Sequence, residues 1–388
     1  MSTRVLILGG GIGGLEAAIQ ARRLGLEATL VSDRDYLWLY PVSIWVATGE
    51  TGPEKVRLSL EGLARAHGFA LRVDAVAAVA GSGAEVRLAS GRALRLGDDF
   101  DHLVLALGGA KTRLEGQEHT LSVCGRPEEA SEIRRRLEDL AGRGGSLAVG
   151  FGGNPKDPSA MRGGPAFELM FNIDSWLRGR GLRRRVDLRF FAPMPNPGER
   201  MGEKAARAAQ AMLRRKGVEL HFGRKIARFE PAAVVFEDGS RLESSLTLFL
   251  AAGAGHPALA DSGLPLNPAG FVVTDERCRV QGLERVWAVG DTAALLGPSW
   301  RAKQGHIAEI MARSALRAIA SGGETKGYVG DVNILCVMDT GRGAAFVYRD
   351  DGRGLLFFLP VVGHWLKKAW GLYYRLSKFR RIPRLPGL

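Results

Sequence analysis

The residues best suited to redox chemistry are three cysteines, Cys124, Cys278 and Cys336, which lie far apart in the sequence. A thiol can act as a nucleophile or exchange electrons with a neighbouring group, but it needs a partner for either task. Three unevenly spaced cysteines make no disulfide framework, and no Cys/His spacing resembles a zinc site. Cys336 stands in an apolar stretch, NILCVMDTG, directly before a turn. It is therefore either a small core residue or a thiol kept for chemistry.

A glycine loop near the N-terminus is the second feature with chemical meaning. Gly9-x-Gly11-x-x-Gly14 lies between a predicted strand, residues 4–8, and a predicted helix. The first glycine permits a tight turn, the second lets the backbone approach a pyrophosphate, and the third lets helix and strand pack closely. Asp33 follows about 20 residues later, at the end of the next predicted strand, where a carboxylate can bind a ribose hydroxyl. The pattern predicts dinucleotide binding, with a purely structural tight turn as the alternative.

The stretch VWAVGDTAALL indicates which dinucleotide is bound. It puts Gly290 and Asp291 at the end of a predicted strand, and we expect a helix to begin directly after them. An aspartate there can accept hydrogen bonds from ribityl hydroxyls, and the helix N-terminus can stabilise negative charge on a reduced ring. Together with LVLALGG, residues 103–109, this is the pattern of flavoproteins with two dinucleotide-binding domains. FAD is therefore the expected cofactor.

A second glycine loop, at Gly150 and Gly152, is degenerate. It is followed by GNPKDPSAMRGG, with prolines where a phosphate loop needs free N–H groups. The next predicted strand ends RFFAPMPNP, without an acid for a nicotinamide ribose. A working NADH site is not expected.

An α/β fold must position these residues. Strand, helix and strand follow one another over residues 4–31 and again over residues 146–193, and a small antiparallel meander ending in a buried strand is predicted within residues 71–107. We therefore predict two Rossmann-like dinucleotide-binding domains, as in glutathione reductase, plus a C-terminal helical tail. The expected parts are an FAD-binding domain (1–108 and 265–330), a second Rossmann-like domain (109–264) and a C-terminal region (331–388).

Several motifs resemble the sulfide:quinone oxidoreductase and flavocytochrome c sulfide dehydrogenase family, over nearly the whole chain. ATLVSDRDYLWLYPVSIWVATGE resembles the family's second strand and the Pro-containing segment after it. GQEHTLSVCGRPEEA resembles the segment with its first cysteine, here Cys124, and GGPAFE resembles its GPAYE helix start, with Glu168 on the glutamate. RAKQGHIAEIMA resembles its PKTG segment beside the flavin, with Lys303 on the lysine. ILCVMDTGRGAAFVYRD resembles the stretch with its last cysteine, here Cys336.

The resemblance implies an FAD-dependent oxidoreductase that passes electrons from sulfide or another reduced sulfur donor to a membrane quinone. It implies attachment to the cytoplasmic side of the cell membrane. A thiolate or persulfide at position 336 is expected to reduce the flavin directly. The expected catalytic residues are Cys336, Cys124, Arg162 and Glu168. The expected cofactor-binding residues are Gly9, Gly11, Gly13, Gly14, Ser32, Asp33, Arg34, Gly108, Gly290, Asp291, Lys303 and Gln304.

One departure from the family is Arg162, in AMRGGPAFE, at the place of the family's middle cysteine. In the family, the middle and last cysteines form the redox pair, so Cys336 cannot make that bridge here. Arginine stays charged, so it can lower the pKa of a nearby thiol or hold an anionic substrate. The alternative is that Arg162 pairs with Glu168 on one helix face and that Cys336 only packs. An ordinary helix-start role for Glu168 also stays open, and Cys278 is expected to be structural.

The C-terminal tail carries much of the formal net charge of +13, because residues 357–388 include seven basic residues and no acid. Those are Lys367, Lys368, Arg375, Lys378, Arg380, Arg381 and Arg384. An apolar stripe at helical spacing runs beside them: Trp365, Leu366, Ala369, Leu372, Tyr373, Leu376 and Phe379. The pattern predicts an amphipathic helix on an anionic membrane surface. The alternatives are a helix docked on the body and a dimer interface in a homo-oligomer, while the apolar stripe argues against nucleic acid.

No apolar run approaches the roughly 20 residues that a spanning helix needs, and the N-terminus lacks a signal-peptide pattern. We therefore expect a soluble or peripheral protein in a reduced intracellular compartment. Two other functions stay open. One is a type II NADH:quinone oxidoreductase, which needs no cysteine, and the other is a non-catalytic flavoprotein that binds sulfur.

Overall fold

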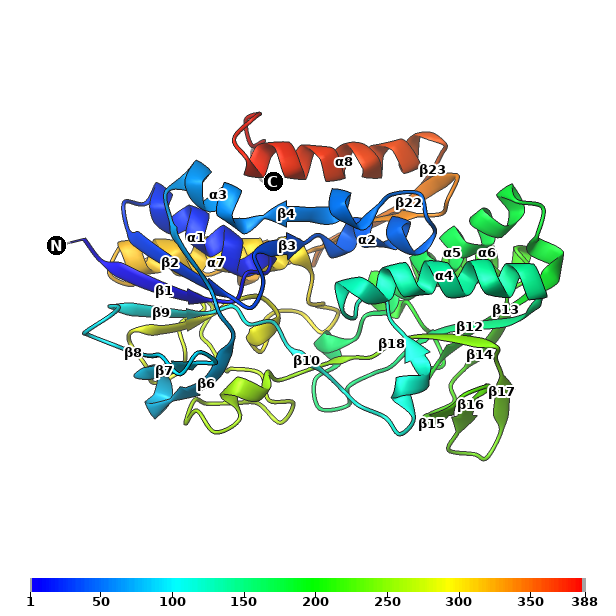
Figure 1. Ribbon diagram of the computed structural model, residues 1–388, viewed down its shortest axis with the longest axis horizontal. Coiled ribbons are helices and arrows are strands. Elements are labelled where there is room, and N and C mark those ends of the chain that lie inside the picture. The colour runs from blue at the N-terminus through cyan, green and yellow to red at the C-terminus, as the bar shows by residue number, and fades with distance from the viewer. Residues whose placement is uncertain (1, 386–388) are drawn as a thin grey trace.

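The computed structural model describes residues 2–385, and two parallel five-stranded sheets lie side by side in it (Figure 1). The first sheet has the strand order β20-β9-β1-β2-β5, and all four pairings are parallel. Its strands are β1 (Arg4–Leu8), β2 (Glu27–Ser32), β5 (Ala70–Val73), β9 (His102–Leu105) and β20 (Val286–Ala288). The central strands β1 and β9 are continuous runs of buried Val, Leu and Ile, as expected for a parallel sheet covered on both faces. Its helices are α1 (Ile12–Arg23), α3 (Leu60–His67) and α7 (Gly305–Ala320).

The second sheet has the strand order β11-β18-β12-β13-β14 and is also parallel throughout. Its strands are β11 (Thr120–Leu121), β12 (Gly145–Phe151), β13 (Val186–Ala192), β14 (Glu219–Phe222) and β18 (Leu246–Leu250). Its helices are α4 (Pro127–Arg143), α5 (Gly163–Gly179) and α6 (Glu203–Arg215). The predicted α/β class with two Rossmann-like sheets is confirmed.

Short antiparallel strands and the helix α2 complete the body. The meander predicted within residues 71–107 is confirmed as β6, β7 and β8, which lead into β9. The elements of this group are β3 (Tyr36–Trp38), α2 (Tyr40–Ala47), β4 (Arg57–Ser59), β6 (Val76–Ala80), β7 (Glu85–Leu88), β8 (Ala93–Arg95), β10 (Ala110–Lys111), β15 (Ile226–Glu230), β16 (Ala233–Phe236), β17 (Arg241–Glu243) and β19 (Gly253–Ala254).

The segment after β20 differs from the prediction. A single 3-10 turn, Gly290–Thr292, follows the strand, and α7 begins only at Gly305, so the helix expected directly after Asp291 is wrong. Pro298 disfavours helical backbone in the residue before it, which prevents a continuous helix from forming there. The turn is instead fixed by Thr292, whose hydroxyl donates a hydrogen bond to the Gly108 carbonyl at 3.1 Å.

The C-terminal region forms an antiparallel sheet followed by a helix. The sheet consists of β21 (Ile334–Asp339), β22 (Gly343–Arg349) and β23 (Gly354–Pro360), and the helix is α8 (Val362–Lys378). In Figure 1, α8 (red) lies along one side of the molecule above α2. It contacts all three strands of the sheet and α2. Among the described residues, no helix combines the length and apolar character needed to cross a membrane.

The apolar stripe of α8 includes exposed side chains, as an interfacial helix requires, whereas two of its lysines point inward against the expectation. Trp365, Leu366 and Leu372 are exposed, with relative exposures of 63%, 43% and 59%, whereas Lys367 and Lys378 are buried. The expectation that the cationic face contacts lipid headgroups is therefore wrong for these two lysines. Glu168 neutralises Lys367, and Glu16 and Glu309 neutralise Lys378, so both lysines pack inward as ion pairs. Arg375, Arg380 and Arg381 remain exposed at the C-terminal end of the tail.

Candidate active site

A cavity of about 2210 Å³ brings most of the predicted site residues together. The catalytic candidates Cys124, Arg162, Glu168 and Cys336 all line it. So do ten of the cofactor-binding candidates: Gly9, Gly11, Gly13, Asp33, Arg34, Gly108, Gly290, Asp291, Lys303 and Gln304. Ser32 and Gly14 do not line the cavity. Ser32 is buried behind Gly10, and its hydroxyl accepts a hydrogen bond from the Arg34 N–H at 3.3 Å.

The glycine loop has the geometry of a phosphate-binding turn. Gly9 has a φ of +110°, which favours glycine, and a Cβ on Gly14 would lie 1.8 Å from the Gly9 carbonyl oxygen. A Cβ on Gly11 would meet no atom within 4 Å. Gly14 thus lets α1 pack closely on β1, while Gly11 faces the open cavity at the N-terminus of α1. The free N–H groups of this helix end favour an anion such as a pyrophosphate.

The order of strands in the first sheet determines in which direction a bound dinucleotide would run across the ends of the strands. Asp33 follows β2 on one side of β1, whereas Gly108 and Asp291 follow β9 and β20 on the other side. A pyrophosphate at the end of β1 would therefore lie between Asp33 and Asp291. The side-chain oxygen of Gln304 is buried on the cavity and has no hydrogen-bond partner among the described residues. These residues fit a dinucleotide cofactor, because they offer both a glycine cradle and an unsatisfied polar group.

Arg162 forms an ion pair with Asp291, on the side of the glycine loop opposite Asp33. About a quarter of each side chain is exposed onto the cavity. Burial alone would raise the pKa of Asp291, but the charges of Arg162, Lys303 and Lys111 and the hydrogen bond from Arg162 together outweigh it, so the pKa is lowered. The predicted alternative, an Arg162–Glu168 pair, is therefore wrong. The reason is that Arg162 precedes the first turn of α5, beside the β20 turn, while Glu168 has its own partner.

Lys303 lies next to this pair. Its ammonium group donates a hydrogen bond to the Asp291 carbonyl oxygen at 3.1 Å and a second one to the Ala293 carbonyl oxygen. It also lies 3.8 Å from the centroid of the Phe271 ring. Burial lowers the pKa of Lys303 to about 8. Lys303 thus stabilises the 3-10 turn that carries Asp291.

Cys336 is a neutral thiol at neutral pH. It lies on β21, opposite Val347 of β22. Burial raises the pKa of Cys336 to about 11, and the charge of Glu168 also raises it, whereas Lys367 lowers it. For this thiol, the expectation of a pKa lowered by Arg162 is wrong, because the guanidinium is engaged by Asp291.

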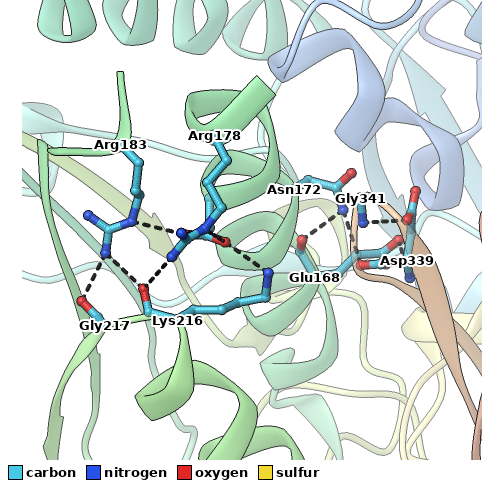
Figure 2. A network of polar contacts seen from close by, with 9 residues as sticks. Glu168, Asn172, Arg178, Arg183, Lys216, Gly217, Asp339 and Gly341 are labelled. Carbon is cyan, nitrogen blue, oxygen red and sulfur yellow. Dashed lines mark hydrogen bonds and ion pairs between the residues drawn. The ribbon is translucent and has the colours of Figure 1, made fainter. Parts of the chain in front are cut away.

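Glu168 connects α5 to the C-terminal region. It forms a buried ion pair with Lys367 of α8, and its Oε1 accepts a hydrogen bond from the Asp339 N–H at 3.2 Å. Burial raises the pKa of Glu168, while Lys367 opposes that shift. Asn172, one turn further along α5, donates hydrogen bonds to the carbonyl oxygens of Glu168 (2.9 Å) and Asp339 (3.1 Å), as Figure 2 shows.

The C-terminal half of α5 is anchored by a second polar cluster (Figure 2). Asp174 is fully buried, and its carboxylate accepts hydrogen bonds from Arg178 (3.0 Å), Arg183 (2.9 Å) and Lys216 (2.8 Å). Burial would raise the pKa of Asp174, but the hydrogen bonds and charges of Lys216 and Arg178 outweigh it and lower the pKa. Fixed at both ends, α5 presents Glu168 to the cavity in one orientation.

Two lysines on the cavity wall, Lys111 and Lys367, were not predicted as site residues. Lys367 had no acid in its own segment, so nothing local indicated an inward side chain. Lys111 follows the end of β9, where ligand-binding residues of parallel sheets gather, and that position was the available signal. Cys278 is fully buried, and its thiol contacts the Met311 carbonyl oxygen at 3.6 Å, so its expected structural role is confirmed.

Comparison with known proteins adds independent information. The family model described as pyridine nucleotide-disulphide oxidoreductase matches residues 3–153 and 183–315. A sulfide-quinone reductase of Aquifex aeolicus is 26% identical over 90% of this chain and 84% of the relative. An NADH dehydrogenase-like protein of Mycobacterium tuberculosis is 27% identical over 75% of this chain and 73% of the relative. The crystal structure of the sulfide:quinone oxidoreductase of Aquifex aeolicus has the same fold, with a TM-score of 0.87 and 23% identity over 98% of this chain and 92% of that one.

Proposed function

The chain belongs to the pyridine nucleotide-disulphide oxidoreductase family, and we propose that it is an FAD-dependent enzyme that passes electrons from a reduced sulfur compound to a membrane quinone. One observation carries the proposal: the thiol of Cys336 and the glycine loop open onto the same cavity. The similarity to a sulfide-quinone reductase over 90% of the chain supports it.

The FAD would be held along the path from Asp33 to Asp291. Asp33 would bind the adenosine ribose, the glycine loop at Gly11 the pyrophosphate, and Asp291 the ribityl hydroxyls. The unsatisfied oxygen of Gln304 offers the cofactor a further hydrogen-bond acceptor. When bound, FAD supplies a ring that accepts two electrons from the donor and passes them on to the quinone.

Cys336 would act as the thiol that meets the sulfur donor. At neutral pH the thiol is protonated, so its reaction with the donor requires a neighbouring group that accepts the thiol proton. The ion pair of Glu168 and Lys367 lines the same cavity, and both charges shift the pKa of Cys336. Because burial raises the pKa of Glu168, this carboxylate can hold a proton at a higher pH than an exposed one.

The membrane-facing surface would be the apolar patch that β23 and α8 expose. Its residues have relative exposures between 43% and 65%: Leu355, Phe357, Phe358, Val361, Val362, Trp365, Leu366 and Leu372. An exposed patch of large apolar side chains favours contact with a lipid bilayer. The cavity extends to Leu366, Trp370 and Tyr373 of α8, so a quinone could enter beside this patch. We place the patch on the cytoplasmic side of the cell membrane.

NADH is the rival electron donor, and the relation to an NADH dehydrogenase-like protein makes it worth testing. The second sheet argues against it. A Cβ on Gly163 would lie 2.9 Å from the Phe151 ring, so this ring packs against the first turn of α5, where a second pyrophosphate would bind. No acid stands directly after β13 to hold a ribose, because the chain continues as Pro193-Met194-Pro195.

Anaerobic mixing experiments separate these functions. The purified flavoprotein is mixed with sulfide, with a persulfide or with NADH, and the flavin absorbance is followed before quinone is added. We expect rapid bleaching by the sulfur donor, reoxidation by quinone, and loss of fast bleaching in Cys336→Ala. Bleaching by NADH alone would instead support an NADH:quinone oxidoreductase. Bound FAD that no sulfur donor reduces would indicate a non-catalytic relative.

A further inference from the structure

Lys111 projects a cation into the cavity without a protein partner. It lies on β10, opposite Gly253 of β19, three residues beyond the Gly108 carbonyl that accepts the Thr292 hydrogen bond. This connection places β10 beside the turn that carries Asp291. The Lys111 side chain lines the cavity, and its ammonium group makes no hydrogen bond or ion pair with any residue of the described range 2–385.

The charges around Lys111 do not balance. Arg162 and Lys303 add two further cations, and Asp291 is the acid that acts on Lys111. Arg162 is paired with Asp291 and Lys303 with backbone carbonyl oxygens, so the charge of Lys111 is left uncompensated. Burial lowers the pKa of Lys111 to about 8 and Arg162 lowers it as well, whereas Cys124 and Asp291 raise it. Cys124 therefore belongs to the same cluster.

We propose that Lys111 and Arg162, with Cys124 beside them, form a subsite for an anionic sulfur donor that carries its sulfane sulfur next to a negatively charged group. Thiosulfate is a compound of this class. Cysteine S-sulfonate has the same sulfonate next to a divalent sulfur, but that sulfur is bonded to carbon, so the compound is a non-reducing analogue. The proposal rests on the proposed function and specifies its donor. A guanidinium has five N–H donors, so Arg162 can pair with Asp291 and still offer N–H groups to an oxyanion. Lys111 supplies a point charge on the same wall, and the Cys124 thiol faces the sulfur of the bound compound.

Binding to the holoenzyme is measured under anaerobic conditions after photochemical reduction of the flavin, so that the flavin accepts no electrons and the subsite is tested without turnover. Isothermal titration calorimetry with thiosulfate and with cysteine S-sulfonate would be run on the wild type, Lys111→Met and Arg162→Gln. Each substitution should weaken binding about tenfold or more at pH 7, because it removes a charge-assisted hydrogen bond. Lys156→Met is the matched control, because Lys156 is an exposed lysine outside the cavity. It should bind both anions like the wild type.

The pH dependence adds a second readout. Arg162, Cys124 and Asp291 are the groups that act on Lys111. Lys111 is protonated below about pH 8, so wild-type affinity should fall as the pH rises through that value, and Lys111→Met should lose this fall.

Three outcomes overturn the proposal: no binding of either anion by the wild type, wild-type affinity in both variants, or the same loss in Lys156→Met. If Lys111→Met and Arg162→Gln bind both anions like the wild type but have a shifted flavin midpoint potential, the two cations act on the cofactor ring instead. If both anions bind through Lys111 and Arg162 but no sulfur donor reduces the flavin, the subsite stands and the proposed function fails.

Discussion

The ammonium nitrogen of Lys378, at the end of α8, lies 2.5 Å from the Oε2 atom of Glu16 on α1. Both side chains are almost fully buried. Lys378 also contacts Glu309 of α7 at 2.7 Å, and Arg384 shares Glu16 at 2.9 Å. The last turn of the C-terminal helix is thus tied by charge to the helix that begins at the glycine loop.

Replacing Lys378 with methionine should release the end of α8. Removing one partner of a buried ion pair leaves an uncompensated charge and costs roughly 3–5 kcal/mol. We expect a clearly lower Tm and faster amide hydrogen exchange in α8. Arg375→Met, at an exposed position of the same helix, is the control and should change little. Equal Tm values for the two variants would show that the ion pair does not hold the helix.

The reactivity of Cys336 should depend on its two charged neighbours in opposite directions. With a pKa of about 11, only about one thiol in ten thousand is ionised at pH 7. Alkylation by iodoacetamide should therefore be slow at pH 7 and rise roughly tenfold per pH unit toward pH 11. Glu168→Gln should speed alkylation, because Glu168 raises this pKa, and Lys367→Met should slow it, because Lys367 lowers it. Mass spectrometry of the modified peptide measures both rates, and shifts of the same sign would contradict this assignment.

Two glycines of the N-terminal loop should respond differently to an added side chain. Gly11→Val should fold but bind little flavin, because a Cβ there meets no protein atom within 4 Å and the larger side chain would enter the cavity. Gly14→Ala should lower the Tm strongly, because its Cβ would lie 1.8 Å from a carbonyl oxygen of Gly9. Flavin absorbance and thermal unfolding report the two effects. Full flavin content in Gly11→Val would place the cofactor elsewhere.

Vesicle binding should depend on the apolar patch of β23 and α8 more than on charge. Trp365→Ser and Phe358→Ser should each weaken co-sedimentation with vesicles about tenfold or more, from roughly 1.5–3 kcal/mol per buried side chain. Leu24→Ser is the control, because Leu24 is a 37% exposed leucine outside the patch. Anionic lipid should add at most the contribution of the three exposed arginines, about 1 kcal/mol each. Binding that requires anionic lipid would contradict this view.

Local signals were sufficient for the first β–α–β unit and the glycine loop. The strand predicted at residues 4–8 is β1, and the spacing of Gly9, Gly11 and Gly14 indicated the turn, of which Gly9 and Gly11 line the cavity. These features are encoded within about 35 residues, where periodicity and backbone conformation determine the structure.

Interactions between distant residues could not be predicted in the same way. The inward direction of Lys367 depends on Glu168, 199 residues earlier, and that of Lys378 on Glu16, 362 residues earlier. Periodicity placed the apolar stripe of α8 on one face but gave no sign of which face meets the body. The Arg162–Asp291 pair spans 129 residues and joins two sheets, so no local pattern indicates it.

The inward lysines of α8 also determine how rigid its outer surface is. Glutamates contact this helix at Lys367, Lys368 and Lys378, near both of its ends. The exposed apolar side chains of α8 therefore stand on a surface that is already ordered before anything adsorbs to it. Such preorganisation would lower the entropic cost of adsorption to a bilayer and would fix the tilt of the whole molecule relative to it.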